Sequence, residues 1–239
     1  MQKLRVSFVA GVTPGKWMDR FTERYPEVEL AASRQDFGDI LDQLANDQAD
    51  VVFVRYRGES PKDATRHVIP LYEELEVLCA AKDHDVEYYE ETIPEETAAS
   101  FPQVDLADYP EEVGGIPTAM EVVASGAQVL RVPQSVARLF HRKDVIYRVI
   151  EPGAPSMIGI AWPTAMEDTR MVDEFIGIVR GRSANSSRQT SVRNSEQQAK
   201  RINDKKKAVA KAKAQEAAKK AKQQAKKQAR SGSKGRKRR

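Results

Sequence analysis

Apolar and polar residues alternate in blocks along residues 4–56, in the order strand, helix, strand, helix, strand. Residues 4–10 (LRVSFVA) are β-branched and aromatic with apolar alternation, which predicts a strand. Residues 27–33 (EVELAAS) predict a second strand, and residues 49–56 (ADVVFVRY) a third that is apolar through its centre and therefore buried on both faces. Strands alternating with helices indicate a parallel α/β fold.

The first predicted helix begins at Thr13 and the proline after it, because Thr can cap free backbone N–H groups and Pro is favoured at the first helical position. Trp17, Phe21 and Tyr25 recur at every fourth position, which places three aromatic rings on one helix face. The proline after Tyr25 ends the helix. Residues 36–48 (DFGDILDQLANDQ) predict a second helix, whose inner face carries the side chains Ile40, Leu41 and Leu44.

The turn between the first strand and its helix, FVAGVTPGKW, only superficially resembles a phosphate-binding loop. Gly11 and Gly15 are one position too close together, and Trp17 stands where a Mg²⁺-binding hydroxyl is required. The turn is expected at the carboxyl edge of the sheet, where α/β proteins bind small ligands. Two interpretations stay open: the turn binds a ligand, or its glycines only permit the chain to turn.

Charge divides the chain into two parts. Residues 183–239 hold 20 Lys and Arg against three acids, a net charge of +17, whereas residues 1–182 carry a net charge of −13. An acidic body with a basic tail points to a polyanionic partner for the tail. The apolar side chains lie almost entirely in the body, which is long enough for a sizeable core.

The body shows no export signal. Its single cysteine, Cys79, lies in the apolar run LEVLCAA, which excludes an internal disulfide and fits a reducing cytoplasm. No run approaches the roughly 20 apolar residues that cross a bilayer. A cytoplasmic protein without membrane contact is expected.

Catalytic constellations are not found in the sequence. His67, His84 and His141 are scattered, with no Cys or acid at metal-ligand spacing beside them. The motifs of hydrolases, metalloproteases and dinucleotide enzymes are absent from the sequence. We expect neither an enzyme, nor a metal site, nor a cofactor.

Several segments, in the right order, resemble the effector-binding domain of LysR-type transcriptional regulators. The matching segments cover residues 4 to 182: LRVSFVAGVTPGKWMDRFTERYPEVELAASRQDFGDILDQLANDQADVVFVR, HVIPLYEELEVLCAAKDHDV, VVASGAQVLRVPQSVARLF and MIGIAWPTAMEDTRMVDEFIGIVRGR.

This resemblance implies a two-lobed fold like that of type 2 periplasmic binding proteins, with two hinge crossings and a small metabolite between the lobes. Lobe one would comprise about residues 1–80 and 158–182, and lobe two about 81–157. Family domains commonly form dimers, so a homodimer through the body is expected. By position, the expected ligand-binding residues are Val12, Thr13, Lys16, Arg55, Thr118 and Gln128.

Of these residues, Arg55 could hold the carboxylate of an organic acid or amino acid in bidentate fashion, with help from Lys16. For Lys16, solvated surface charge is the favoured interpretation. Thr118 is expected at a helix start after a proline. The chain also departs from the family: it starts three residues before the first strand, so we expect no winged helix-turn-helix and no sequence-specific DNA reading by one. Gln128 and Arg131 stand where the family usually has small residues.

The basic tail has two segments. Residues 183–195 are polar and Ser-rich, which predicts a flexible linker. The basic tail proper is residues 196–239. Residues 196 to about 230 are rich in Ala, Lys and Gln, which predicts a partly formed helix or disorder, and the last nine residues (SGSKGRKRR) predict a flexible basic tip. The expected nucleic-acid-binding residues are Lys205, Lys206, Lys207, Lys211, Lys213, Lys219, Lys220, Lys222, Lys226, Lys227, Arg230, Lys234, Arg236, Lys237, Arg238 and Arg239.

Dense Lys and Arg suffice for DNA or RNA binding without sequence preference, because phosphate neutralisation releases counterions. Contact with the acidic body or another acidic protein is the main competitor, whereas the Ala stripe is too weakly apolar for a membrane surface. The sequence therefore predicts a non-enzymatic regulatory or nucleic-acid-associated protein. The alternative is a small-molecule sensor or protein-interaction module with an accessory tail.

Overall fold

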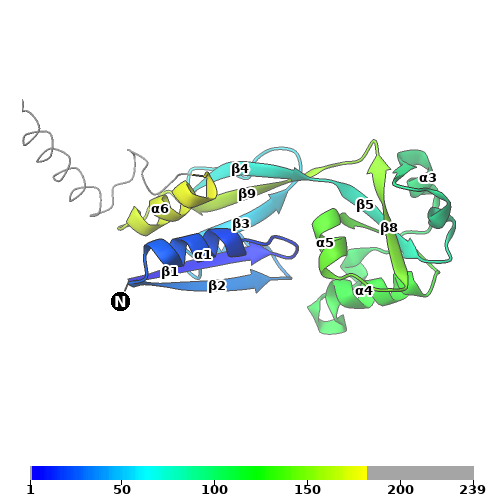
Figure 1. The fold of residues 1–239 in the computed structure, drawn as a ribbon, viewed down its shortest axis with the longest axis horizontal. Helices are drawn as coiled ribbons and strands as arrows, with labels where there is room; N and C mark the ends of the chain where they lie inside the picture. The colour runs from blue at the N-terminus through cyan, green and yellow to red at the C-terminus, as the bar shows by residue number, and fades with distance from the viewer. Residues whose placement is uncertain (1, 182–239) are drawn as a thin grey trace, which may run out of the picture. The chain divides into compact units, whose positions relative to one another are not determined.

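The computed structural model describes residues 2–181, which lie in one compact unit of the chain. The predicted linker 183–195 and the predicted basic tail 196–239, with all the expected nucleic-acid-binding residues, lie outside the described residues. The body contains two sheets, each covered by helices (Figure 1).

The first sheet has five strands in the order β2-β1-β3-β9-β4. As predicted, β1 runs parallel to β2 and to β3, whereas β9 is antiparallel to β3 and β4. The elements of this part are β1 (Gln2–Val9), α1 (Gly15–Arg24), β2 (Val28–Gln35), α2 (Asp42–Ala45), β3 (Val51–Tyr56), β4 (Arg66–Glu74), β9 (Ser156–Pro163) and α6 (Arg170–Val179).

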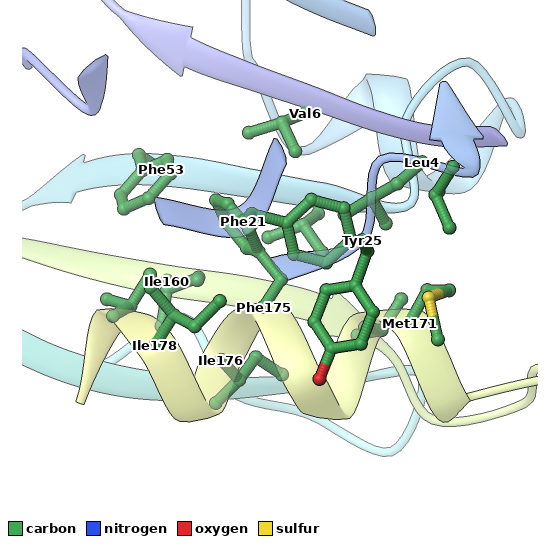
Figure 2. Packing of buried hydrophobic residues seen from close by; sticks show 14 of the residues in the cluster. Leu4, Val6, Phe21, Tyr25, Phe53, Ile160, Met171, Phe175, Ile176 and Ile178 are labelled. Atoms are coloured by element: carbon green, nitrogen blue, oxygen red, sulfur yellow. The ribbon is translucent and has the colours of Figure 1, made fainter. Parts of the chain in front are cut away.

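Helices α1 and α6 lie on one face of this sheet, and their side chains share a core with it (Figure 2). The Phe175 ring meets Phe21 edge to face, with ring centroids 5.6 Å apart, and meets Phe53 in the same way at 6.2 Å. Trp17 stacks on Phe53, so the predicted aromatic face of α1 is confirmed. Such pairs stabilise a core beyond their buried area.

The opposite face of the first sheet packs against α2 and its flanks. Along β3, Val51 and Phe53 face the α1 and α6 core, and Val52 and Val54 face the α2 core. All four are buried, so the prediction that this strand is covered on both faces is confirmed.

The second sheet has four strands in the order β6-β8-β5-β7. Strand β5 is antiparallel to β7 and β8, and β6 is parallel to β8. Helices α4 and α5 contribute to the core on one face, and α3 to the core on the other. The elements are β5 (Glu76–Ala81), η1 (Asp85–Tyr88), β6 (Thr92–Pro94), α3 (Glu95–Ser100), η2 (Leu106–Asp108), η3 (Glu111–Val113), α4 (Gly115–Ala124), β7 (Leu130–Pro133), α5 (Gln134–Leu139) and β8 (Val145–Glu151).

The chain crosses between the sheets twice, which confirms the two-lobed α/β architecture. One crossing joins β4 to β5 at Leu75, and the other joins β8 to β9. Lobe one is hereafter residues 2–74 and 156–181, and lobe two is residues 76–151. The sequence suggested a crossing at about residue 80. In the structure the crossing comes earlier, at Leu75, because Glu76 to Cys79 already pair with β7 in the second sheet.

Two local predictions about the helices were wrong. Helix α1 begins at Gly15, with Pro14 as its N-cap residue and no side-chain cap, so Thr13 does not cap it and Pro14 precedes the first turn. Helix α2 spans only Asp42–Ala45, because Gly38 adopts a positive φ of 73° and Asp47 one of 54°. The predicted inner residues of α2 are nevertheless buried.

Candidate functional site

Two arginine–glutamate pairs lie where the lobes meet. In the first pair, Nε of Arg55 at the end of β3 donates to Oε2 of Glu74 at 2.6 Å, and both side chains are largely buried. The same guanidinium donates through Nη2 to the Ala10 carbonyl at 2.9 Å and to the Ser135 hydroxyl at 3.1 Å. Ser135 lies in α5 of lobe two, so Arg55 binds both lobes.

The second pair is centred on Glu76, the first residue of β5, which is buried. One carboxylate oxygen accepts a hydrogen bond from Nη2 of Arg57 at 2.8 Å. The other oxygen lies 3.9 Å from Nη1 of Arg131 on β7 and accepts from the Ala154 amide at 3.3 Å. Glu76 therefore connects the end of β3, strand β7 and the second crossing.

Beside these pairs lies a pocket of about 480 Å³ between the lobes, which we call the arginine pocket. Its volume suits a small ligand. Its walls combine three guanidinium groups with apolar side chains from lobe two, and its lining residues are Arg55, Tyr56, Arg57, Leu106, Ile116, Arg131, Val132, Pro133, Val136 and Ser156.

A second pocket of about 910 Å³, which we call the turn pocket, is lined by the β1–α1 turn, the end of β4 and α5. Burial raises the pKa of Tyr72 on its wall, with a smaller contribution from the Glu74 carboxylate. The Tyr72 phenol is therefore a neutral hydrogen-bond donor at physiological pH. Gly11 and Ser135, which line this pocket, approach each other closely: a Cβ added at Gly11 would lie 2.4 Å from the Ser135 hydroxyl.

The structure distributes the six predicted ligand-binding residues over several places. Val12 and Thr13 line the turn pocket, where Val12 is buried and Thr13 exposed. Arg55 lines the arginine pocket, with its guanidinium already bound by Glu74. Lys16 is exposed and lines neither pocket, in keeping with the favoured interpretation of its charge.

Thr118 and Gln128 line neither of the two pockets. Helix α4 begins at Gly115, so Thr118 lies inside the helix rather than at its start. Gln128 donates to the Gln103 carbonyl at 2.9 Å, next to the end of β7 that is distant from the crossing. The expectation for Thr118 rested on a helix start at this residue, whereas α4 starts at Gly115.

Sequence reasoning missed Arg57, Glu74 and Glu76 as members of the site. Two signals could have found them: Arg55 and Arg57 are two positions apart at a strand end, and so are Glu74 and Glu76. Residues at that spacing share one face of a strand, so each set can form a row of side chains. Which arginine pairs with which glutamate, and that the Arg57–Glu76 pair joins the two lobes, was not visible in the sequence.

The cysteine and two of the histidines, which could have been reactive groups, are packed against other side chains. Cys79 is buried in β5, and burial raises the pKa of its thiol to about 12. The His84 ring meets Phe101 edge to face, and His67 packs against Trp162. Among residues 2–181 no group of three or more His, Cys, Asp or Glu is placed to hold a metal ion. In the same range, no helix has the length and apolar character of a membrane span.

Comparison with models of protein families assigns the chain to a family. The family model described as the LysR substrate binding domain matches residues 2–184. The chain therefore belongs to this family, and its two lobes with a pocket between them define a LysR-type effector-binding domain with a regulatory, ligand-sensing role. A comparison with curated protein sequences found no match.

Solved structures share the fold at low sequence identity. The reduced OxyR regulatory domain from Pseudomonas aeruginosa has a TM-score of 0.58 at 18% identity, over 75% of this chain and 97% of that one. The BenM effector-binding domain with its effector benzoate has a TM-score of 0.58 at 14% identity, over 75% and 90%. Full-length CbnR complexed with its target DNA has a TM-score of 0.59 at 14% identity, over 76% and 70%.

Proposed function

We propose that this protein is a non-enzymatic ligand-sensing regulator, whose body binds a small metabolite in the arginine pocket and whose tail binds nucleic acid without sequence specificity. The observation that carries the first half is a pocket walled by both lobes, in which polar groups converge beside apolar side chains. The structures of BenM with benzoate and of CbnR with DNA are consistent with this role.

Ligand binding between the lobes has a clear route to regulation. Arg55 and Arg57 belong to lobe one, whereas Arg131 and Ser135 belong to lobe two. A ligand that contacts both sets favours one arrangement of the lobes by the difference in its affinity for the alternatives. The proposal needs no group that does covalent chemistry.

The test for an effector is a thermal-shift screen of the full-length protein with organic acids, amino acids, sugars and nucleosides. A ligand at a hundredfold excess over its Kd contributes about 2.7 kcal/mol. For a protein of this size that corresponds to a rise in Tm of roughly 5–10 °C. If no compound of any class raises the Tm, the sensing half of the proposal fails, and a protein-interaction module with an accessory tail becomes the better interpretation.

The second half rests on the charge of the tail, a net +17 over residues 183–239. A full-length variant with five tail lysines changed to Gln is compared with the unaltered protein, using random-sequence duplex DNA and structured RNA at several salt concentrations. Losing five lysine–phosphate contacts should make the slope of log K against log salt shallower by up to about 4.5 for duplex DNA. The substituted residues are Lys219, Lys220, Lys222, Lys226 and Lys227.

A matched control replaces five exposed basic residues of the body by Gln. It should bind DNA as the unaltered protein does, because those charges lie on an acidic body. Equal losses in the two variants, or no binding by the unaltered protein, would contradict the proposal for the tail. The control residues are Lys3, Arg20, Lys62, Lys82 and Lys143.

On this proposal the protein works in the cytoplasm, beside the nucleoid or the ribosome. We also propose that the body pairs as a homodimer, as LysR regulators do. Light scattering coupled to gel filtration at micromolar concentration gives the mass directly. A mass equal to the 26.8 kDa of one chain at every concentration would exclude pairing.

A further inference from the structure

The chemistry of the arginine pocket identifies the class of its ligand. Three guanidinium groups line it, and its lining includes no carboxylate. The carboxylates paired with Arg55 and Arg57 are buried, since Glu74 is 7% exposed and Glu76 is 6% exposed. Glu95, which pairs with Arg131, has a 40% exposed side chain but does not line the pocket. An entering ligand therefore meets three guanidinium groups and no carboxylate of the lining.

The guanidinium groups keep donors available. Arg131 binds both oxygens of Glu95 through Nη1, at 3.0 and 2.9 Å. Arg57 binds Glu76 through Nη2. A guanidinium has five N–H donors, so these contacts leave several of them available. Among residues 2–181 there is no partner for Nε and Nη2 of Arg131, nor for Nε and Nη1 of Arg57.

The glutamates paired with the three arginines also hold the guanidinium groups in place. Glu76 lies between Arg57 and Arg131, with one oxygen toward each. This carboxylate is buried and also accepts a hydrogen bond from the Ala154 amide, so its hydrogen bond orients Arg57 before a ligand arrives. Arg131 is oriented by its hydrogen bonds to Glu95, with Glu76 3.9 Å away. Preorganised donors bind an anion with less loss of conformational freedom than mobile side chains do.

We propose that the ligand is a small organic acid without an ammonium group, whose carboxylate is bound by Arg57 of lobe one and Arg131 of lobe two. This inference rests on the proposed function and gives its ligand a chemical class. An amino acid is disfavoured because its ammonium group would face three guanidinium groups and no carboxylate of the lining. The apolar part of the acid packs against Leu106, Ile116 and Val136.

Binding in this way joins the lobes. Arg57 follows β3 in the first sheet, and Arg131 lies on β7 in the second. A carboxylate has two oxygens and accepts from two guanidinium groups at once, so one ligand group bridges the two lobes. Neutral analogues of the same shape lack the charge-assisted hydrogen bonds and leave the arginine donors unsatisfied.

The test compares three acids with their neutral amides on the full-length protein: benzoate with benzamide, phenylacetate with phenylacetamide, and hexanoate with hexanamide. The measurements are Tm and, for any compound that shifts it, the Kd by calorimetry. At least one acid should bind at least tenfold more tightly than its amide, because hydrogen bonds to charged groups are about twice as strong as neutral ones. Alanine and phenylalanine serve as ammonium-bearing comparisons and should not raise the Tm.

Variants then assign the roles of the residues. Arg131→Gln and Arg57→Gln should each weaken the bound acid by about tenfold or more, since each removes a charged donor. Arg142→Gln is the control, because this arginine pairs with Asp144 on the surface of lobe two, away from the lining. Arg131→Lys keeps the charge and gives a second variant if Arg131→Gln does not fold by circular dichroism.

The possible results separate the two proposals. Amides that bind as tightly as acids, or acids that bind Arg131→Gln and Arg57→Gln unchanged, overturn the organic-acid class and leave the sensing function standing. Phenylalanine or alanine binding in preference to the acids also overturns the class. No shift with any compound of this set, or of the wider screen described above, defeats the sensing function itself.

Discussion

Gly11→Ala is the substitution that most directly tests how closely the lobes approach each other. Gly11 has a positive φ of 89°, and a Cβ at this position would lie 2.4 Å from the Ser135 hydroxyl and 3.0 Å from its backbone carbonyl carbon. Gly58 offers a matched control, because it also has a positive φ, 70°, yet nothing lies within 4 Å of its added Cβ.

The size of the effect follows from these two geometries. An alanine in the left-handed region costs about 1–2 kcal/mol at either position. At position 11 the methyl group must also displace Ser135 of α5, and overpacking of this kind costs about 1–3 kcal/mol more. That cost includes the loss of the hydrogen bond from Arg55 to the Ser135 hydroxyl, 3.1 Å long, which the displacement breaks.

Urea unfolding of the full-length variants, followed by tryptophan fluorescence and circular dichroism, measures both free energies of unfolding. Gly11→Ala should lose about 1–3 kcal/mol more than Gly58→Ala. Adding Ser135→Ala to Gly11→Ala should recover only part of this difference, because the contact with the hydroxyl is relieved and that with the carbonyl carbon remains. Equal losses in the two glycine variants would refute the inferred contact between the lobes.

Three further outcomes are expected from the body. Phe175→Ala should cost about 3–5 kcal/mol in urea unfolding, whereas Tyr88→Ala, whose side chain is 87% exposed, should change the stability little; similar losses would place the core elsewhere. Burial raises the pKa of the Cys79 thiol to about 12, so the folded protein should not react with a thiol reagent at pH 8 and should react once unfolded in urea. The Thr65 hydroxyl, the Thr65 amide and a nearby arginine lower the pKa of Asp63 to about 2, so its contribution to stability is complete above its ordinary value of 3.8 and is lost as the pH falls through about 2. NMR titration of the Asp63 carboxyl should give that midpoint, and Thr65→Val should move it toward 3.8; a midpoint that Thr65→Val leaves unchanged would contradict the assigned cause.

Much of lobe one could be read from local patterns. The aromatic side chains at positions 17, 21 and 25 share a helix face whatever the helix packs against, because the spacing alone decides it. The run of apolar residues in β3 likewise required cover on both faces. Both predictions concern patterns that span several residues, so an error of one or two residues in where the element begins or ends does not change them.

Element ends were less predictable, since capping depends on backbone angles that residue type only biases. Thr13 is a favourable capping residue, yet the helix starts later, after Pro14. The expected helix of residues 36–48 became a short α2 because the chain turns at Gly38 and at Asp47. The same small shifts moved Thr118 from a helix start into a helix.

The sequence by itself determined the order of strands and helices in lobe one, the family resemblance over the body and the contrast in charge between body and tail, because each depends on residue type and spacing. Only the tertiary structure decided which charges meet. Arg57 and Glu76 are brought together by the path of the chain through the first crossing, and Arg131 reaches the same carboxylate from a strand much further along the chain. Ion pairs between distant segments leave no local period, so the arginine pocket emerges only when both sheets are in place.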